Sequence, residues 1–286
     1  MTPDQKSRCE RASGSPAVRL TPLAGGCLAE VLRVDLADGR AVVVKAGRES
    51  DRLDIEGRSL QALGEKGGGL PVPRLDLVDP DLLVMEHLPN DGGLDATAQR
   101  DAARYIATLH AAPRDFYGYD EDTRIGPLHQ PNPPADKWVP FYRDHRLLFM
   151  GRVAMERGGL SAAGYAALET LAGRLESLIG EPEHPSLLHG DLWTGNVLAS
   201  GGRITGFIDP ATYHGDAEMD LAFSTLFGTF GEDFFDAYRE IRPFDYAGFL
   251  DTRRDLFNLY PLLVHTALFG GGYANSVSRI VQRFTG

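Results

Sequence analysis

A chain of 286 residues with 43% hydrophobic and 24% charged side chains has room for one large domain or two lobes, and this composition excludes a disordered or fibrous protein. Its formal net charge of −11 argues against nucleic acid as a partner, because a phosphate backbone and an acidic surface repel each other. Two cysteines are too few for a disulfide framework or a thiolate zinc site, which favours a reducing compartment.

The first residues are polar, and residues 1–15 are expected to form a disordered tail without the apolar core of a signal peptide. The most apolar late segment, LYPLLVHTALFGGGYA, is interrupted by His265 and by glycines, so no membrane span is expected. Together these features predict a cytoplasmic protein that does not associate with membranes.

Residues 16–88 have the pattern of a small β-rich lobe. The stretches AEVLRVDL and AVVVKA, joined by DGR, predict a hairpin whose second strand ends near Lys45. LDIEGRSLQAL has helical spacing of Glu56 with two leucines, and Asp54 is a candidate N-cap. PRLDLVD and DLLVMEHL predict two more strands. The segment LPNDGG then marks a lobe boundary.

Residues 89–286 are mostly helical in pattern, with long amphipathic segments at 97–112, 137–153 and 161–180. Three short extended pieces interrupt them, at 187–189, 196–199 and 204–208, and the last two could pair through SGGR. The fold class predicted is therefore α+β, with an antiparallel sheet plus one helix followed by a helical lobe. Asp191, Asn196 and Asp209 all fall at strand ends or in loops, where polar side chains can converge.

These polar residues match the parts that a phosphoryl-transfer site requires. Such a reaction needs a lysine on the phosphates, oxygen ligands for a metal, and an aspartate beside the attacking hydroxyl. Lys45, Glu56, the pair Asp191 and Asn196 at D-x-x-x-x-N spacing, and Asp209 supply these parts in kinase order. Glu49 and Asp54 are alternatives to Glu56 as the partner of the lysine.

The glycine-containing loop LAGGCLAE is the expected cover for a nucleotide, because Gly25 and Gly26 allow backbone to approach phosphates. The chain contains no GxxxxGK[ST] string, no GxGxxG after a strand and no HExxH, which removes the main signatures of P-loop, Rossmann and zinc-protease proteins.

The sequence resembles the fructosamine kinase (ketosamine 3-kinase) family, a branch of the protein-kinase-like fold related to aminoglycoside phosphotransferases. The resemblance runs from about residue 18 to 284. It is carried by GGC, VVVK, EGRSLQAL, VMEHL, HGDLWTGNV, FIDPATYHGDAEMDLAFSTLFGTF and FGGGY at 25–27, 42–45, 56–63, 84–88, 189–197, 207–230 and 269–273.

This resemblance implies phosphorylation of the 3-hydroxyl of a ketosamine by ATP, which leads to deglycation of amines or proteins. It implies Asp191 as catalytic base or hydroxyl orienter, and Asn196 and Asp209 as Mg²⁺ ligands. Lys45 would hold phosphates and pair with Glu56, and the backbone from Glu86 through His87 to Leu88 would contact adenine.

Two departures from protein kinases stand out. Gly190 replaces the arginine of HRD, and Pro210 follows Asp209 where protein kinases have Phe and Gly. Regulation by an activation loop is therefore not expected, and the expected partner is a small ketosamine or glycated amine.

The string HGD occurs twice, which provides an internal comparison. Asp191 is followed by Asn196 five residues later, whereas Asp216 is followed by Leu221 and an acidic helix start. Asp191 is therefore predicted to be catalytic and Asp216 to be an N-cap. Asp220 is predicted to brace the catalytic loop, and His189 and His110 are predicted to be structural.

Several residues are candidates for contact with the acceptor. Trp193 could stack on a sugar or an amine, or fill the lobe core, and both interpretations remain open. Trp138, Tyr142 and His265 are further candidates, although their spacing fits packing equally well. Cys27 could be redox-sensitive if its pKa is lowered in the glycine loop.

The leading hypothesis is a ketosamine kinase that uses ATP and Mg²⁺. The alternatives are a related small-molecule kinase of aminoglycoside or choline type and, from a different class, a non-catalytic nucleotide-binding protein. The sequence leaves open whether the protein is a monomer or a homodimer.

Overall fold

The computed structural model describes residues 1–23, 29–112 and 114–286. The chain divides into two compact units, each made of three segments. Unit 1 comprises Met1–Leu109, Thr194–Ala211 and Phe230–Ile241, and unit 2 comprises His110–Trp193, Thr212–Thr229 and Arg242–Gly286. Gly25 and Gly26, predicted to cover a nucleotide, and Cys27, predicted to be a possible redox site, lie outside the described residues.

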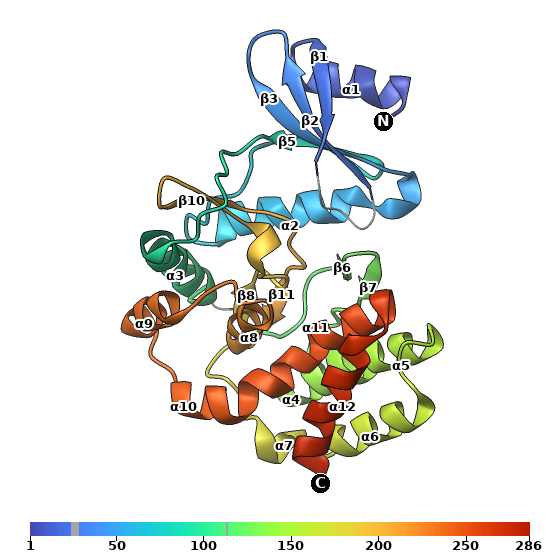
Figure 1. Ribbon diagram of the computed structural model, residues 1–286, viewed down its shortest axis with the longest axis vertical. Helices are drawn as coiled ribbons and strands as arrows, with labels where there is room; N and C mark the ends of the chain where they lie inside the picture. Colours follow the sequence, from blue (N-terminus) through green and yellow to red (C-terminus); the bar gives the residue numbers. More distant parts are fainter. Residues whose placement is uncertain (24–28, 113) are drawn as a thin grey trace. The chain divides into compact units, whose positions relative to one another are not determined.

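Unit 1 contains a five-stranded antiparallel sheet with the order β1-β2-β3-β5-β4 (Figure 1). The predicted hairpin is confirmed, since β2 and β3 pair through Leu32 and Val44, and the two later strands pair as well. The strands are β1 (Ala17–Pro22), β2 (Glu30–Leu36), β3 (Ala41–Ala46), β4 (Leu75–Asp79) and β5 (Leu82–Glu86).

A helix covers each face of this sheet. Alternate strand residues such as Val44 and Val84 pack with Cys9 of α1 (Pro3–Ser13), whereas Leu83 and Met85 pack with Leu60 of α2 (Leu53–Lys66). This follows from the strand period of two, which sends successive side chains to opposite faces. The expectation of a disordered tail at 1–15 is wrong, because a capping box stabilises the first turn of α1 and the buried Cys9 packs on the sheet.

Helix α2 lies close to the sheet because it carries glycine where it passes β4. A Cβ on Gly57 would lie 2.5 Å from Cγ1 of Val78, closer than side chains can approach. The helix starts after Arg52, whose φ of 54° places it in the left-handed region. The prediction that Asp54 is the N-cap is therefore wrong, and its carboxylate instead pairs with Arg52 and Arg58.

Unit 1 also includes most of α3 and a second hairpin, so the expected boundary after residue 88 does not match its extent. Asp101 of α3 accepts a hydrogen bond from the N–H of Ile204 at 3.0 Å, and the N–H of Phe207 donates to the carbonyl of Pro71 at 2.9 Å. These contacts are between residues far apart in the chain. The elements are α3 (Ala96–His110), β9 (Val197–Ser200), β10 (Arg203–Phe207) and α9 (Glu232–Ile241), with 3-10 turns at Glu49–Asp51 and Thr194–Asn196.

Unit 2 is mostly helical, as predicted, and is built around α11 (Arg254–Phe269), which contacts α5, α8 and α12. The segment predicted as one helix at 137–153 is helical, with a π-helical stretch at Arg143–Leu148. Its other helices are α4 (Trp138–Tyr142), α5 (Phe149–Glu156), α6 (Ala162–Ala172), α7 (Leu175–Leu178), α8 (Glu218–Leu226), α10 (Tyr246–Gly248), a second π-helical stretch (Phe249–Arg253) and α12 (Gly272–Thr285).

Two small antiparallel pairs complete unit 2. Strand β6 (Thr123–Ile125) pairs with β7 (Leu128–Gln130), and β8 (Ser186–Leu188) pairs with β11 (Tyr213–Gly215).

Within the described ranges no helix is long and apolar enough to cross a membrane.

Candidate active site

Lys45 lies near the end of β3 on the face that α2 covers. Its Nζ donates to Oε1 of Glu56 at 2.7 Å and also to the carboxylate of Asp209. Lys45 is only 7% exposed, so its ammonium group depends on these partners for its hydrogen bonds. Of the three candidates for the partner of Lys45, the structure selects Glu56, because Asp54 pairs with arginines and Glu49 belongs to the 3-10 turn before α2.

Two carboxylates therefore share one buried ammonium group. Burial by itself lowers the pKa of Lys45, but Glu56 and Asp209 outweigh it, so the pKa is raised and the lysine stays charged. Burial raises the pKa of Glu56 to about 7, with repulsion from Asp209 adding to the effect and Lys45 opposing it. The cluster carries an excess of negative charge when both carboxylates are ionised, and a further cation would relieve it.

Asn196 and Asp209 are brought together by the hairpin of β9 and β10. The N–H of Ile208 donates to the carbonyl of Asn196 at 3.0 Å, and Phe207 pairs with Val197 in register. Asp209 follows with a φ of 54°, a conformation that is uncommon outside glycine and that recurs at functional sites. The two residues therefore leave adjacent strands at the same end of the hairpin.

This donor set suits magnesium. Mg²⁺ prefers oxygen ligands and usually takes only one or two protein side chains, the rest being phosphate oxygens and water. An Asn amide and an Asp carboxylate match this preference, and among the described residues no group of three or more His, Cys, Asp or Glu side chains is arranged to hold a metal. The two side chains therefore fit the protein's share of a Mg²⁺ site.

Asp191 lies in unit 2, in the loop after β8. The carboxylate of Asp220 accepts hydrogen bonds from the N–H groups of His189 and Gly190, both at 2.8 Å, and Nδ1 of His189 accepts one from the N–H of Asp191 at 3.3 Å. Gly190 has a φ of 84°, a left-handed backbone conformation that favours glycine at this position. The predictions that Asp220 braces this loop and that His189 fixes it are confirmed.

His110 supports the same brace from the end of α3. Its Nε2 lies 3.2 Å from a carboxylate oxygen of Asp220, and both side chains are buried. Burial lowers the pKa of His110, although Asp220 opposes this effect. The structural role predicted for His110 is confirmed.

The second HGD copy has different surroundings. Its His214 and Gly215 lie in β11, and Asp216 accepts a hydrogen bond from the N–H of Glu218 at 2.9 Å as α8 begins. The N-cap position of α8 is Ala217, so the N-cap prediction for Asp216 was off by one residue. Burial and the nearby Glu218 carboxylate raise the pKa of Asp216 to about 7.

The motifs that hold these residues match one family over their full extent. A model of the fructosamine kinase family matches residues 1–285. The chain belongs to the fructosamine kinase family. Members are phosphotransferases that act on a hydroxyl group, and membership supports phosphorylation of ketosamines with ATP as donor.

Relatives of this fructosamine kinase family member carry consistent names. It is 31% identical to a chloroplastic protein-ribulosamine 3-kinase of Arabidopsis thaliana over 93% of this chain and 82% of the plant protein. It is 37% identical to a probable ketoamine kinase of Synechocystis sp. over 62% of this chain, and the match spans 59% of that protein.

Solved structures agree on the fold. A fructosamine-3-kinase-type protein from Thermobifida fusca superposes with a TM-score of 0.85 at 31% identity, covering 97% of this chain and 98% of that one. The aminoglycoside phosphotransferase APH(4)-Ia gives a TM-score of 0.69 at 17% identity over 98% of both chains, which shows a common fold. The predicted α+β, protein-kinase-like fold is confirmed.

Two of the residues expected to contact the acceptor are core residues in this family member. Trp138 and Tyr142 are fully buried, and their rings pack on each other and on Phe257. The hydroxyl of Tyr142 donates to the carbonyl of Leu256. The expectation that they line a substrate site is wrong, because helical spacing fits a core equally well.

Trp193 and His265 lie nearer the surface of unit 2. Trp193 is 37% exposed and makes an edge contact with Phe227 at 5.8 Å between ring centroids, and Phe227 contacts the ring of His265 at 5.2 Å. Sequence reasoning missed Phe227, although it belongs to the segment that carried the family resemblance. These three rings form what we call the aromatic cluster.

The segment expected to contact adenine ends β5. Glu86 is exposed and pairs with Val42, and its backbone N–H donates to Arg74, whereas Nε2 of His87 lies 3.4 Å from the Arg33 guanidinium. A Cβ on Gly206 would lie 2.2 Å from Cδ1 of Leu88, so Leu88 packs against β10. Contact of this segment with adenine stays a prediction.

Proposed function

We propose that this protein transfers the γ-phosphoryl group of ATP to the 3-hydroxyl of a ketosamine. The observation that supports this most directly is the buried Lys45, which holds two carboxylates in a chain that also carries the HGDLWTGN segment. A lysine placed in this way is the part of a kinase site that binds nucleotide phosphates. The relative APH(4)-Ia has been solved in a complex with ADP and hygromycin B.

Asp191 would accept the proton of the attacking hydroxyl. The hydroxyl oxygen forms a bond to the γ-phosphorus, the bond from that phosphorus to the leaving oxygen of ADP breaks, and the proton goes to the Asp191 carboxylate. The fixed backbone of residues 189–191 supports this role, because positioning and electrostatic stabilisation together supply most of the rate enhancement in such reactions.

Lys45 would exchange the carboxylate of Asp209 for phosphates when nucleotide binds. Asn196 and Asp209 would hold Mg²⁺, which neutralises phosphate charge when it is bound. Glu56 would then remain as the partner that orients Lys45. Burial and Asp209 raise the pKa of Glu56, and a Mg²⁺ ion near the cluster would lower it again. The ion would thereby favour the ionised carboxylate that orients Lys45.

The aromatic cluster would receive the acceptor. An aromatic face binds both the apolar face of a sugar and a cationic amine, and Trp193 is adjacent in sequence to the catalytic loop. The net charge of −11 favours amines over anionic acceptors.

A cytoplasmic location, where ATP is available, is part of the same proposal.

A panel of acceptors tests the proposed function. The purified protein is incubated with ATP and Mg²⁺ and either ribulose- or fructose-modified lysine, an aminoglycoside or choline, and ADP release is followed. Turnover is expected only with ketosamines. It should disappear with a 3-deoxy ketosamine, and ³¹P NMR should show a sugar 3-phosphate.

Turnover with the aminoglycoside or choline alone would replace the ketosamine with another acceptor class. Nucleotide binding without turnover of any acceptor would favour a non-catalytic protein. Asp191→Asn serves as the matched control for contaminating kinases, since it replaces a single carboxylate oxygen by an NH₂ group and should abolish ADP release.

A further inference from the structure

The N-terminal helix α1 is hydrogen-bonded to the segment of chain that links Lys45 to Glu56. This connection, residues 47–52, starts two residues after Lys45 and ends just before α2, whose first turn carries Glu56. The distance between the two side chains therefore depends on the course of this short connection. Its two ends are held by the turn between β4 and β5.

That turn accepts one hydrogen bond from the first residue of the connection and one from the first residue of α2, directly after it. The N–H of Gly47 donates to the carbonyl of Asp81 at 2.9 Å, and the N–H of Leu53 donates to the carbonyl of Pro80 at 2.9 Å. A Cβ on Gly47 would lie 2.6 Å from a carboxylate oxygen of Asp51, so the connection folds back on itself and leaves no room for a side chain at residue 47. Residues 80 and 81 thus define where β3 ends and where α2 begins.

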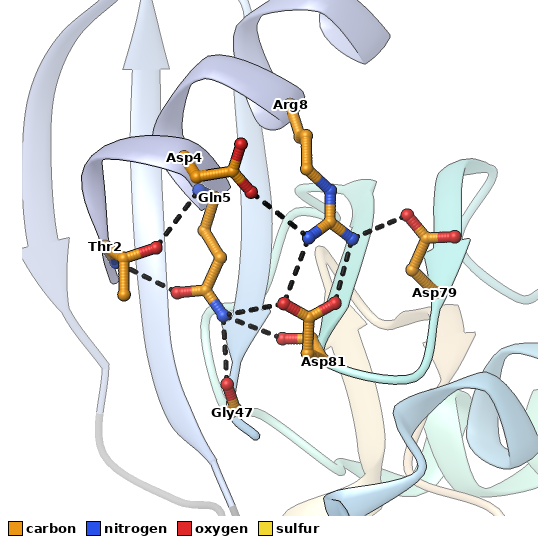
Figure 2. A network of polar contacts seen from close by, with 7 residues as sticks. All are labelled: Thr2, Asp4, Gln5, Arg8, Gly47, Asp79 and Asp81. Carbon is orange, nitrogen blue, oxygen red and sulfur yellow. Dashed lines mark hydrogen bonds and ion pairs between the residues drawn. The ribbon is translucent and has the colours of Figure 1, made fainter. Parts of the chain in front are cut away.

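The side-chain NH₂ group of Gln5, in α1, donates hydrogen bonds both to the connection and to the turn between β4 and β5. Its Nε2 donates to the carbonyl of Gly47 at 2.9 Å, to the carbonyl of Asp81 at 3.1 Å and to the Asp81 carboxylate at 3.2 Å. Its Oε1 faces the other way and accepts from the N–H of Thr2 at 2.9 Å, which completes a capping box for α1 (Figure 2). Gln5 is 5% exposed, so these donors have little access to water.

Arg8 lies about one helical turn after Gln5 and forms ion pairs with the turn between β4 and β5. Its guanidinium donates to both carboxylate oxygens of Asp81, at 2.8 and 3.0 Å, and to Asp79 at 2.6 Å (Figure 2). The hydrogen bonds from Arg8 lower the pKa of Asp81, so the pair remains ionised. A bidentate arginine fixes orientation as well as distance.

We propose that α1 is a positioning element for the nucleotide site, with Gln5 and Arg8 as positioning residues that set the Lys45 and Glu56 pair. This deepens the proposed function and rests on its assignment of Lys45 to the nucleotide phosphates. Loosening α1 from Gly47 and Asp81 lets the connection relax. The ammonium group then loses its fixed position, and nucleotide affinity falls.

Gln5→Glu separates this role from the stability of α1. Glutamate can complete the capping box as glutamine does, and an acidic residue suits the first turn of a helix. The side chain has almost the same size, but two donors become an oxygen facing the carbonyls of Gly47 and Asp81. The helix should persist while its tie to the connection is broken.

Nucleotide affinity is measured with a fluorescent ATP analogue, without any acceptor, and backbone hydrogen exchange is followed over residues 47–53. We expect the Kd of Gln5→Glu to rise about tenfold, because small misplacements of a binding group cost this much or more. Exchange at 47–53 should become faster. In turnover assays KM for ATP should rise and KM for the acceptor should stay constant.

Arg8→Ala is the second variant, and Arg11→Ala on the same helix is its matched control, because Arg11 is exposed and removes the same charge. Arg8→Ala should weaken nucleotide binding and Arg11→Ala should not. A merely structural role would lower the folded fraction and kcat while KM for ATP stays at the wild-type value. That result, or wild-type Kd values for both Gln5→Glu and Arg8→Ala, would overturn the proposal.

The two proposals fail in different ways. If the wild type binds the analogue but phosphorylates no ketosamine, the proposed function fails, and the variants still decide the role of α1 through Kd. If the wild type phosphorylates ketosamines and the variants bind nucleotide normally, only the role of α1 is lost. A wild type that binds no nucleotide overturns both.

Discussion

The carboxylate of Asp220 accepts a hydrogen bond from the backbone N–H of Gly190, at 2.8 Å, one residue before Asp191. The same carboxylate also binds the N–H of His189 and lies against His110. Three donors therefore share two buried oxygens. The position of Asp191 depends on a residue that lies 29 positions later in the chain.

Asp220→Asn should lower kcat about tenfold to a hundredfold, because asparagine has one acceptor oxygen for these partners and turns an N–H₂ group toward a donor. The free energy of unfolding should fall by about 1–3 kcal/mol, the cost of an unsatisfied buried group. Steady-state kinetics and urea denaturation measure the two effects. Asp236→Asn, at an exposed carboxylate, is the control, and an unchanged kcat in Asp220→Asn would contradict the brace.

Gly190→Ala tests the backbone conformation of the same loop. A φ of 84° is strained for any residue with a Cβ, so stability should drop by about 1–2 kcal/mol. Gly158→Ala is a matched control, since Gly158 has a φ of 77° and open space around its Cα. We expect similar shifts of the unfolding midpoint for both variants and a loss of kcat only for Gly190→Ala. Equal kcat values would show that this turn does not position Asp191.

Much of the fold could be predicted because its signals are local. Alternation identified β2 and β3, helical spacing identified α2, and the SGGR turn identified the hairpin that carries Asn196 and Asp209. Each of these patterns reflects which face of one element is buried. The residues at the ends of such elements are placed by the same patterns.

Two of the errors share a physical cause, which is that the deciding contacts are distant in sequence. Residues 1–15 look polar, yet Arg8 meets Asp79 and Asp81 more than 70 positions away and Cys9 enters the sheet core. Trp138 has the spacing of a helix face, but that spacing does not say whether the face meets solvent or other helices. The sequence did not indicate the left-handed conformation at Arg52 that moved the start of α2.

Lys45→Ala removes the cation from the cluster that Lys45 forms with Glu56 and Asp209. Without the ammonium group, Glu56 and Asp209 repel each other, and the pKa of Glu56 should rise above about 7. We expect kcat/KM for ATP to fall at least about a hundredfold. Kinetics with varied ATP measure this, and Lys137→Ala is the control. A change of less than about twofold would remove Lys45 from the nucleotide site.

The two HGD copies provide a matched pair of variants for the catalytic assignment. Asp191→Asn should lower kcat by at least about a thousandfold while the Kd for a fluorescent nucleotide stays within about twofold, because only the proton acceptor is lost. Asp216→Asn makes the same chemical change beside α8 and should retain most of the turnover. Equal losses in the two variants would mean that Asp191 has no special role.

Asp216 should also make stability depend on pH. Burial, with help from Glu218, raises the pKa of its carboxyl from 3.8 to about 7 in the folded state. Between these two values the folded state holds a proton that the unfolded state has released, so the free energy of unfolding falls as the pH rises through this window. Below pH 4 both states are protonated, and the stability that this group contributes is fully present there.

Asp216→Asn should remove this part of the pH dependence. Asparagine can still accept the hydrogen bond from the N–H of Glu218, but it carries no proton to lose. Urea denaturation at pH 5 and pH 8 should show wild type losing on the order of 2 kcal/mol more than the variant, since each pKa unit corresponds to about 1.4 kcal/mol and Glu218 shares the titration. Glu56 titrates in both proteins and cancels in the comparison. Parallel pH profiles would mean that Asp216 is ionised in the folded state at pH 5, and its burial would then have to be offset by the arginines near α8.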